Sequence, residues 1–424
     1  MDAMIDTQER AMKEVWRKTH SAVVASLLLA AGQTGAADAG MSEIEAWRAF
    51  CAQLERAGVQ ILNEHRPPNE IDRAEGALYL AQQLSYVVGS VLDERQKAFP
   101  LLRVQATTIN KWGLDGADAK YTASPIQGSG VYRLHGRLGS ARLIAIQLAQ
   151  TTSEYRAFKS LSGEEFGADE NGDFEIMISQ QRPKGWKGPW LQMNPAANRL
   201  LVRQYFGDWE TEQPSDMMLE RVDWVDEEKP LSVAEASRLL SAMNQRFANR
   251  SVLWMPWLAK TRKNLVNRFE PITGNEQGLK NNAYGEGWFR IGDDEALVIE
   301  LDKPQADLWS FQLGNYWWES IDYINGTGSL NGDQAVASSD GRYRLVISLR
   351  DPGVLNWLDP AGHNEGAIMY RYQNTDNAPV PKATLIKFDQ LRVFLPDDTP
   401  LVTVGQRRAD IETRRIHAAR RWAP

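Results

Sequence analysis

Two loops in the last third of the chain concentrate the side chains that could do chemistry. The first is Asn315-Tyr-Trp-Trp-Glu-Ser-Ile-Asp-Tyr323, and the second runs from Arg350 to Gly366. Both lie between strand-like runs, and together they hold aromatic rings, carboxylates, an arginine and one histidine. Such a mixture is typical of a polar pocket with a few ionisable groups among apolar walls. We therefore take these loops as the candidate site.

His363 is the leading candidate for acid–base chemistry. It lies between Gly362 and Asn364 in a loop rich in proline and glycine, two residues before Glu365. An imidazole titrates near neutral pH, so this histidine could act as a general base or a general acid. The alternative is a histidine that only hydrogen-bonds the loop to its neighbours.

Glu319 and Asp322 form a possible pair of catalytic carboxylates. They are three residues apart, so a helical turn over residues 316–323 would place them on one face. Paired carboxylates can divide the acid and base roles, as they do in glycoside cleavage. The same residues could instead hold Arg350 or cap a turn.

Arg350 could neutralise a substrate carboxylate or a developing oxyanion. A salt bridge within the site, to Asp351, Asp359 or Glu365, is the alternative. The candidate catalytic residues are His363, Glu319, Asp322, Glu365 and Arg350. The candidate substrate-binding residues are Trp317, Trp318, Tyr323, Asn356, Trp357, Asp351 and Asp359.

The motif inventory favours chemistry without a cofactor. A metal site of His363 with Glu365, Asp359 or Asp322 is an alternative, but cupin-like sites on jelly rolls usually take several histidines, and this block has one. The sequence also lacks a dinucleotide-binding glycine motif after a strand, a Walker loop and a Gly-x-Ser-x-Gly elbow. We therefore expect no cofactor and no resident metal.

The composition is that of a soluble globular protein with more than one lobe. At 424 residues the chain exceeds what one hydrophobic core usually supports. Its net charge of −7 argues against nucleic acid as a partner, which leaves a small-molecule or sugar-like ligand. Paired arginines at 407–408, 414–415 and 420–421 fit the solvated face of a last helix. A single cysteine excludes a disulfide within the chain.

The N-terminus leaves two localisations open. Residues 22–31 form an apolar run of signal-peptide length, preceded by basic residues and followed by a small-residue site at 37–39. The leading segment is long and also carries acidic residues, which argues for a cytoplasmic protein. Export to the periplasm, with residues 12–39 as the signal peptide, is the alternative. The run is too short to span a membrane as a helix.

Hydrophobic periodicity divides the chain into helical and β regions. Capping-box spacings at Ser42–Glu45 and Ser232–Glu235 predict helix starts, and Pro256 predicts a break in the second of these regions. Residues 271–285 read as a loop. The expected segments are a leader or disordered extension at 1–40, an N-terminal helical region at 41–100, a first β half at 101–215, inserted helices and a loop at 216–283, a second β half with the candidate site at 284–396, and a C-terminal helix at 397–424.

The two β regions resemble each other, which predicts a duplication. Three stretches recur in the same order: residues 130–134 at 287–291, 171–179 at 340–348, and 190–205 at 357–372. The dipeptides Asn171-Gly172 and Asp340-Gly341 precede strands in both halves and predict hairpin turns. The Asp359, His363 and Glu365 set has no counterpart in the first half, as expected of a single site.

The second β region also resembles a bacterial domain-of-unknown-function family, number twelve-fourteen. The resemblance rests on Gly314–Tyr323, on the Asp340-Gly341 hairpin and on Arg350–Gly366. It is strongest over residues 284–373 and extends weakly from about residue 100. It implies a jelly-roll β-sandwich with helical additions, and it brings no settled reaction. The predicted fold is therefore α+β: a jelly-roll-like antiparallel β-sandwich in two pseudo-repeated halves, with N-terminal, inserted and C-terminal helices.

Two functions from different classes follow. The first is a cofactor-independent lyase or hydrolase that acts on a small organic or sugar-like substrate in a tryptophan-lined polar pocket. The second is a non-catalytic module that stacks a glycan or an apolar ligand on the same tryptophans. The enzyme is favoured because a module built for stacking would not need so many ionisable groups in two adjoining loops.

Overall fold

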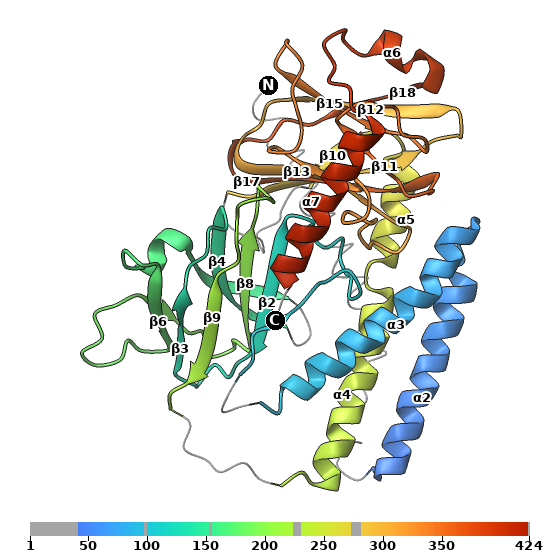
Figure 1. Cartoon of the computed structure of the whole chain (residues 1–424). Coiled ribbons are helices and arrows are strands. Elements are labelled where there is room, and N and C mark those ends of the chain that lie inside the picture. Colours follow the sequence, from blue (N-terminus) through green and yellow to red (C-terminus); the bar gives the residue numbers. More distant parts are fainter. Residues whose placement is uncertain (1–40, 97–99, 152–154, 224–229, 273–280, 423–424) are drawn as a thin grey trace, which may run out of the picture. The chain divides into compact units, whose positions relative to one another are not determined.

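A helical N-terminal region precedes two β halves in the computed structural model, which describes residues 41–96, 100–151, 155–223, 230–272 and 281–422 (Figure 1). The predicted leader at 1–40 lies outside the described residues. The chain divides into two compact units, one of residues 1–55 with 228–246 and one of 56–227 with 247–424. Within the described ranges, no helix is both long enough and apolar enough to cross a membrane.

The first unit contains most of the helices α2 (Glu43–Val59) and α4 (Val233–Val252). At the start of α2, the Ser42 backbone N–H donates to the Glu45 carboxylate at 2.9 Å, and the Glu45 N–H donates to the Ser42 hydroxyl at 3.4 Å. At the start of α4, the Glu235 N–H donates to the Ser232 hydroxyl at 3.2 Å. Both predicted helix starts are confirmed, because each side chain satisfies a backbone group that the helix leaves unpaired.

The second unit contains the two β halves, which Figure 1 shows as separate groups of strands, cyan to green and yellow to red. The strands of the first half are β1 (Arg103–Val104), β2 (Ala119–Pro125), β3 (Tyr132–Arg137), β4 (Leu143–Gln150), β5 (Arg156–Ser162), β6 (Asp173–Ser179), β7 (Trp190–Gln192), β8 (Arg199–Tyr205) and β9 (Asp216–Arg221). The strands of the second half are β10 (Phe269–Ile272), β11 (Ala283–Arg290), β12 (Glu295–Asp302), β13 (Gln305–Gly314), β14 (Ser329–Asn331), β15 (Arg342–Ile347), β16 (Trp357–Leu358), β17 (Glu365–Asn377) and β18 (Lys382–Lys387).

The two halves have the same topology. The sheets of the first half are ordered β1-β2-β8-β4-β5 and β7-β6-β3-β9, and those of the second are β10-β11-β17-β13-β14 and β16-β15-β12-β18. Adding nine to each strand number of the first half reproduces the second. The pairs β6–β7 and β15–β16 are parallel, and the other strand pairings among the described residues are antiparallel. The predicted α+β fold of two similar sandwich halves is confirmed.

The register identifies which sequence matches were correct. Tyr205 lies opposite Ala119, and Tyr372 lies opposite Ala283, so these tyrosines are equivalent. Gly172 and Gly341 have φ values of +81° and +80° in matching turns, as predicted. The match of residues 130–134 with 287–291 was wrong, since the first runs into β3 and the second lies in β11, whereas the counterpart of β3 is β12. Apolar and polar residues alternate in most strands, so a match of five residues can pair a strand with the neighbour of its true counterpart.

Each half has its own apolar core between its two sheets. The side chains at these centres are fully buried and come from both sheets: Leu134, Ile146, Ile176 and Val202 in the first half, and Leu297, Ile299, Phe311 and Leu345 in the second. Burying a side chain of this size stabilises the fold by about 1.5–3 kcal/mol. The two cores are therefore separate, and smaller apolar clusters, such as that of Ala119, Tyr205 and Leu308, contain residues of both halves.

Three helices of the second unit flank the sandwiches. They are α3 (Glu70–Asp93), α5 (Met255–Asn264) and α7 (Val404–Trp422), and the shorter elements are η2 (Gln60–Glu64), η3 (Gly163–Phe166), η4 (Phe388–Gln390) and α6 (Leu391–Phe394). The predicted break at Pro256 is confirmed, because α4 ends at Val252 and this proline lies in the first turn of α5. The loop predicted at 271–285 was partly wrong, because its two ends pair as β10 and β11.

The arginines of α7 correct the prediction of a solvated basic face. Arg408, Arg415 and Arg420 are exposed as predicted. Arg414 and Arg421 are each 1% exposed, and they lie seven residues, or two helical turns, apart on one face. Arg414 donates to the Tyr323 carbonyl at 3.2 Å, and Arg421 donates to the His417 ring. Backbone carbonyls and the Trp209 ring contact both guanidinium groups and offset the cost of burying them, although Arg421 Nη2 has no hydrogen-bond partner in the described part of the chain.

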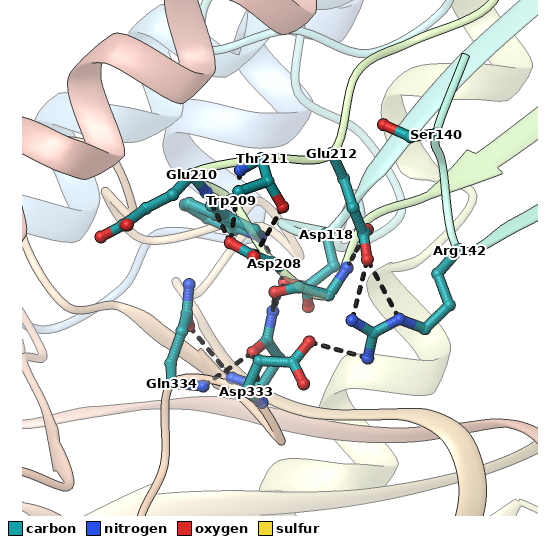
Figure 2. A network of polar contacts seen from close by, with 12 residues as sticks. Asp118, Ser140, Arg142, Asp208, Trp209, Glu210, Thr211, Glu212, Asp333 and Gln334 are labelled. Atoms are coloured by element: carbon teal, nitrogen blue, oxygen red, sulfur yellow. Dashed lines mark hydrogen bonds and ion pairs between the residues drawn. The ribbon is translucent and has the colours of Figure 1, made fainter.

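A polar network joins the two β halves (Figure 2). Arg142, from the first half, donates to Glu212 at 2.8 Å and to Asp333 of the second half at 2.7 Å. Asp118 accepts hydrogen bonds from the Trp209 indole at 3.0 Å and from the Asn331 amide at 2.7 Å. Because these groups satisfy one another across the junction, we interpret the network as structural.

Candidate functional site

The start of α3 and the loop between β16 and β17 bring an imidazole and two carboxylates together. Asp72 and Glu75 are three residues apart on α3, so they share one face of the helix. His363 Nε2 lies 2.9 Å from Glu75 Oε2 and 3.6 Å from Asp72 Oδ1. We call these three residues the histidine–carboxylate cluster. His363 was predicted from the sequence, but neither carboxylate was.

The turn before β17 orients the imidazole. Ala361 and Gly362 both have positive φ values, +50° and +88°, which folds the chain back on itself. Asp359 supports this turn by accepting the Ala361 N–H at 2.8 Å. His363 Nδ1 then lies 2.8 Å from the Pro360 carbonyl, to which it donates. The opposite ring nitrogen, Nε2, therefore faces the carboxylates.

Burial shifts the proton affinities of the cluster. Burial raises the pKa of Asp72 to about 6, against the opposing influence of Asn69 and His363. Burial lowers the pKa of His363, but the hydrogen bond and the charge of Glu75 outweigh it and leave that pKa above its ordinary value. Asp72 is 0% exposed and His363 is 2% exposed, so the cluster is enclosed except at Glu75, whose side chain is 29% exposed.

Trp317 and Asn315 hold the cluster against the loop between β13 and β14. The Trp317 indole N–H donates to the Asp72 carbonyl at 2.6 Å, and the ring stacks on Tyr79 with 5.7 Å between centroids. The Asn315 amide donates to Glu75 at 3.0 Å, while its oxygen accepts the Glu319 N–H at 3.1 Å. Asn315 thus connects the cluster to the second predicted acid.

Glu319 is a buried acid with an unusual proton affinity. It is 2% exposed, and within the described part of the chain its Oε1 atom has no hydrogen-bond partner. Burial raises the pKa of Glu319 to about 8; Lys111 opposes this shift, and Asp115 adds to it. Asp115 is also buried, and it accepts the Ser320 hydroxyl at 3.1 Å. Asp115 and Lys111 lie before β2 and were not predicted.

The predicted pairing of Glu319 with Asp322 is wrong. Residues 316–323 form turns without a helix, so the two side chains do not share a face. Asp322 is exposed, and its carboxylate accepts the backbone N–H groups of Ile324 and Asn325, both at 2.9 Å. Asp322 therefore caps a turn, which was the alternative considered from the sequence.

Three other predicted charged residues lie outside the cluster. The guanidinium carbon of Arg350 is 4.2 Å from the centroid of the Phe388 ring. Asp351 pairs with Arg407 at 3.1 Å, and Glu365 pairs with Arg290 at 2.7 Å. The salt bridges considered between Arg350 and these carboxylates are therefore replaced by pairs with other arginines.

The predicted aromatic pocket is not open to solvent. Trp317, Trp318, Tyr323 and Trp357 are between 1% and 9% exposed. Tyr323 packs against Trp209, and the Trp357 indole donates to the Ser348 carbonyl at 3.0 Å. Asn356, also chosen as a ligand-binding residue, holds the Val336 backbone with two hydrogen bonds. These rings contribute to the packing of the second half and of the helices around it.

A hollow of about 280 Å³ opens next to Trp317. Its other walls are Ile61, Leu62, Arg66, Pro67 and Arg73. Trp317 belongs both to this hollow and to the contacts of Asp72, so the hollow and the histidine–carboxylate cluster share a wall. Two arginines and an indole edge are suited to a small anionic or flat ligand.

One sequence signal could have pointed to the missed carboxylates. Asp72 and Glu75 share a helix face just after the cap residue Asn69, whose side-chain oxygen accepts the Asp72 N–H at 3.0 Å. Acidic residues are common in the first turn of any helix, so the signal is not specific. Their proximity to His363, 288 positions away from Glu75, follows only from the tertiary fold.

Comparison with known proteins identifies relatives without an assigned reaction. The family model described as "Protein of unknown function (DUF1214)" matches residues 121–208, in the first β half. The crystal structure of an uncharacterized protein from Burkholderia cenocepacia is 30% identical, covers 82% of this chain and 98% of its own, and superposes with a TM-score of 0.76. A protein from Vibrio parahaemolyticus is 13% identical, covers 73% of this chain and 100% of its own, and has a TM-score of 0.42. No curated protein matches the sequence.

Proposed function

We propose that this chain, which belongs to the DUF1214 family of proteins of unknown function, is a hydrolase or lyase for a small organic or sugar-like substrate. Glu319 is the general acid in this proposal. It donates a proton to the leaving group or to the carbonyl oxygen of the substrate.

The observation that carries the proposal is the state of the Glu319 carboxyl. With a pKa of about 8, this group holds its proton at neutral pH, and its Oε1 atom has no hydrogen-bond partner among the described residues. A general acid works best when its pKa lies near the working pH. A purely structural buried carboxyl would be expected to have both oxygens satisfied.

Asp115 takes the place that Asp322 had in the sequence-based pair. It lies close enough to Glu319 to raise the pKa of Glu319, and the Ser320 hydroxyl orients its carboxylate. Two acids in one enclosed region can divide acid and base roles when their surroundings differ. Because Glu319 is 2% exposed, the proposal requires a substrate to open the packing around residues 315–320 as it binds.

Non-catalytic binding of a small ligand is the second candidate. The hollow beside Trp317, with Arg66 and Arg73 in its walls, supports it. Stacking of a glycan on Trp318 or Trp357 is not supported, because both rings are buried.

The test is metabolite profiling with purified full-length protein. The wild type and Glu319→Gln are incubated with a mixture of organic acids, amino acids and oligosaccharides, and consumption is followed by mass spectrometry. We expect the wild type to consume one class of compound and the variant to be slower by roughly 10²–10⁴-fold, the contribution of a general acid. The wild-type rate should fall as the pH rises above about 8, where Glu319 loses its proton.

Asp322→Asn is the matched control. It removes a nearby carboxylate that only caps an exposed turn, so turnover should be unchanged. Equal rates for the wild type and Glu319→Gln, or no compound consumed by the wild type, would contradict the enzyme. A ligand that binds without turnover and is lost in Arg73→Gln would support the second candidate instead.

A further inference from the structure

We propose that Asp72, Glu75 and His363 form a binding site for one divalent transition-metal ion. Each residue offers one ligand atom, and the three atoms all lie within 4.8 Å of one another. The two carboxylates come from one face of α3, and the imidazole comes from the turn before β17.

The spacing of the ligand atoms suits such an ion. Metal–nitrogen and metal–oxygen bonds are about 2.0–2.2 Å long, which separates neighbouring ligand atoms by roughly 2.8–3.1 Å in octahedral geometry and roughly 3.3–3.6 Å in tetrahedral geometry. His363 Nε2 lies 2.9 Å from Glu75 Oε2 and 3.6 Å from Asp72 Oδ1. Both distances fall within the span of these ranges, and the ligand atoms of Asp72 and Glu75 lie within 4.8 Å of each other.

The contacts behind the ligands are those of a metal site. A histidine that binds metal through one ring nitrogen usually donates the other N–H to a carbonyl or a carboxylate, which orients the ring. His363 Nδ1 has such a partner in the Pro360 carbonyl at 2.8 Å, and Nε2 faces the carboxylates. Asn315 orients Glu75 in the same way, by donating to Oε2 at 3.0 Å.

Asp72 supplies the independent observation that points to a ligand. It is 0% exposed, and in the described ranges neither of its carboxylate oxygens has a hydrogen-bond partner. Oδ1 points towards His363, at 3.6 Å from Nε2. A buried carboxylate without hydrogen bonds is costly, and a divalent cation between these three side chains would satisfy it.

The donor set selects the class of metal. One neutral imidazole and two carboxylates suit zinc or manganese better than calcium, which prefers six to eight oxygen ligands. Three protein ligands leave at least one coordination position for water or a substrate group, as in catalytic rather than structural sites. The side chain of Glu75, 29% exposed, provides the solvent side of the site.

This inference stands apart from the proposed role of Glu319. It replaces the expectation from the sequence that no metal is bound, and it is tested without a substrate. Failure to bind metal would therefore leave the Glu319 proposal untouched, and absence of turnover would leave the metal site untouched.

The experiment measures metal binding by the full-length protein. The protein is treated with a chelator and dialysed, and Zn²⁺ and Mn²⁺ are then titrated separately by calorimetry, with Mg²⁺ for comparison. We expect one equivalent of Zn²⁺ or Mn²⁺ per chain, a rise in Tm on binding, and weaker binding of Mg²⁺. Elemental analysis after desalting checks the stoichiometry.

Asp72→Asn and His363→Gln test the ligands. Each should weaken binding by at least roughly tenfold, as loss of a metal contact does. Asp72→Asn should not lower the Tm of the metal-free protein, because it removes a buried charge that has no hydrogen-bond partner within the described residues and only a long ion pair, 3.6 Å, with His363. His135→Gln is the matched control, since His135 lies beside Glu220 at 3.4 Å on a strand of the first half. It should bind metal like the wild type.

Three results would overturn the proposal. The first is no binding of Zn²⁺ or Mn²⁺ above that of Mg²⁺. The second is equal affinity in the wild type and Asp72→Asn, which would place the ion elsewhere. The third is a metal-free Asp72→Asn protein that is less stable than the wild type and a wild type that metal does not stabilise, which would make the cluster a structural ion pair.

Discussion

Two buried carboxylates, Asp72 and Glu319, are central to the two functional proposals. Asp72 and Glu319 are each enclosed, and burial raises both pKa values, to about 6 and about 8. Charging such a group costs free energy because the interior solvates it poorly. Buried groups with strongly shifted pKa values often belong to functional sites, and each of the two proposals includes one of these residues.

The raised pKa of Glu319 predicts a pH-dependent stability. The folded protein holds this proton up to a pH of about 8, whereas the unfolded chain releases it near 4.5. The stabilising effect is therefore complete below pH 4.5 and is lost as the pH rises through 8, by up to about 1.4 kcal/mol per pH unit. Urea unfolding at pH 5.5 and 8.5 should show a larger loss for the wild type than for Glu319→Gln, by an amount on the order of 1–3 kcal/mol.

Asp322→Asn is the control for this measurement, because Asp322 is exposed and burial does not keep it protonated. The same pH dependence in the wild type and Glu319→Gln would mean that Glu319 is ionised in the folded protein.

The sequence identifies functional candidates that lie in loops dense in ionisable groups, and it misses those that only the tertiary fold brings together. His363 and Glu319 were recognisable because their loops are dense in ionisable groups. Glu75 was not, because its contact with His363 joins positions 288 residues apart and leaves no local pattern. Trp318 and Trp357 were expected to face a ligand, but both are buried, and composition alone does not distinguish a packed ring from an exposed one.

Among the elements, α3 positions the cluster because it packs closely on the loop between β13 and β14. Gly76 allows this approach, since a Cβ atom at this position would lie 2.5 Å from the Trp317 ring. The ring is 1% exposed and stacked on Tyr79, so it has little freedom to move aside. The position of Asp72 therefore depends on a small residue one turn later in the same helix.

Gly76→Ala should destabilise the protein although alanine favours helices. Overpacking costs roughly 1–3 kcal/mol, which exceeds the gain of about 1 kcal/mol in helix propensity. Gly58→Ala in α2 is the matched control, because apart from its chain neighbours and the backbone of its own helix no heavy atom lies within 4 Å of an added Cβ. It should raise the free energy of unfolding by about 0.5–1 kcal/mol. Urea unfolding of both variants measures the difference, and two stabilising substitutions would show that α3 does not pack as tightly as described.

For α7, hydrophobic periodicity predicts the helix but not which of its faces is buried. Its existence follows from the sequence, because residues 404–422, within the expected segment 397–424, are helical. Its orientation does not, since a basic helix face is usually solvated and here Arg414 and Arg421 are buried. The aromatic and carbonyl partners of these arginines come from both β halves, for example Phe206 and Tyr323, and no local pattern in α7 indicates them.

For the whole molecule, the junction between the halves combines the polar network with small apolar clusters. Each half buries a large apolar core between its own two sheets, and smaller clusters with residues from both halves, such as that of Ala119, Tyr205 and Leu308, contribute to the junction. The duplication was predictable because similar turns, such as those at Gly172 and Gly341, recur in the two halves. The junction was not predictable, because Asp118, Arg142 and Asn331 belong to no shared motif.

Asn331→Ala should weaken the junction more than its surface counterpart Asn325→Ala. The Asn331 amide donates to Asp118 at 2.7 Å and to the Gly207 carbonyl at 3.0 Å, and Asn331 is 0% exposed. Removing it leaves two buried acceptors each short of a donor, at a cost of roughly 1–3 kcal/mol for each group. Asn325 is exposed, so the loss of its hydrogen bonds should cost less than about 0.5 kcal/mol. Hydrogen exchange shows where the structure is weakened. In Asn331→Ala, exchange should become faster at residues 205–209 and 329–334 before it becomes faster in the core of either half. Equal effects of the two substitutions would mean that the halves are held together by other contacts, with α7 as the first candidate.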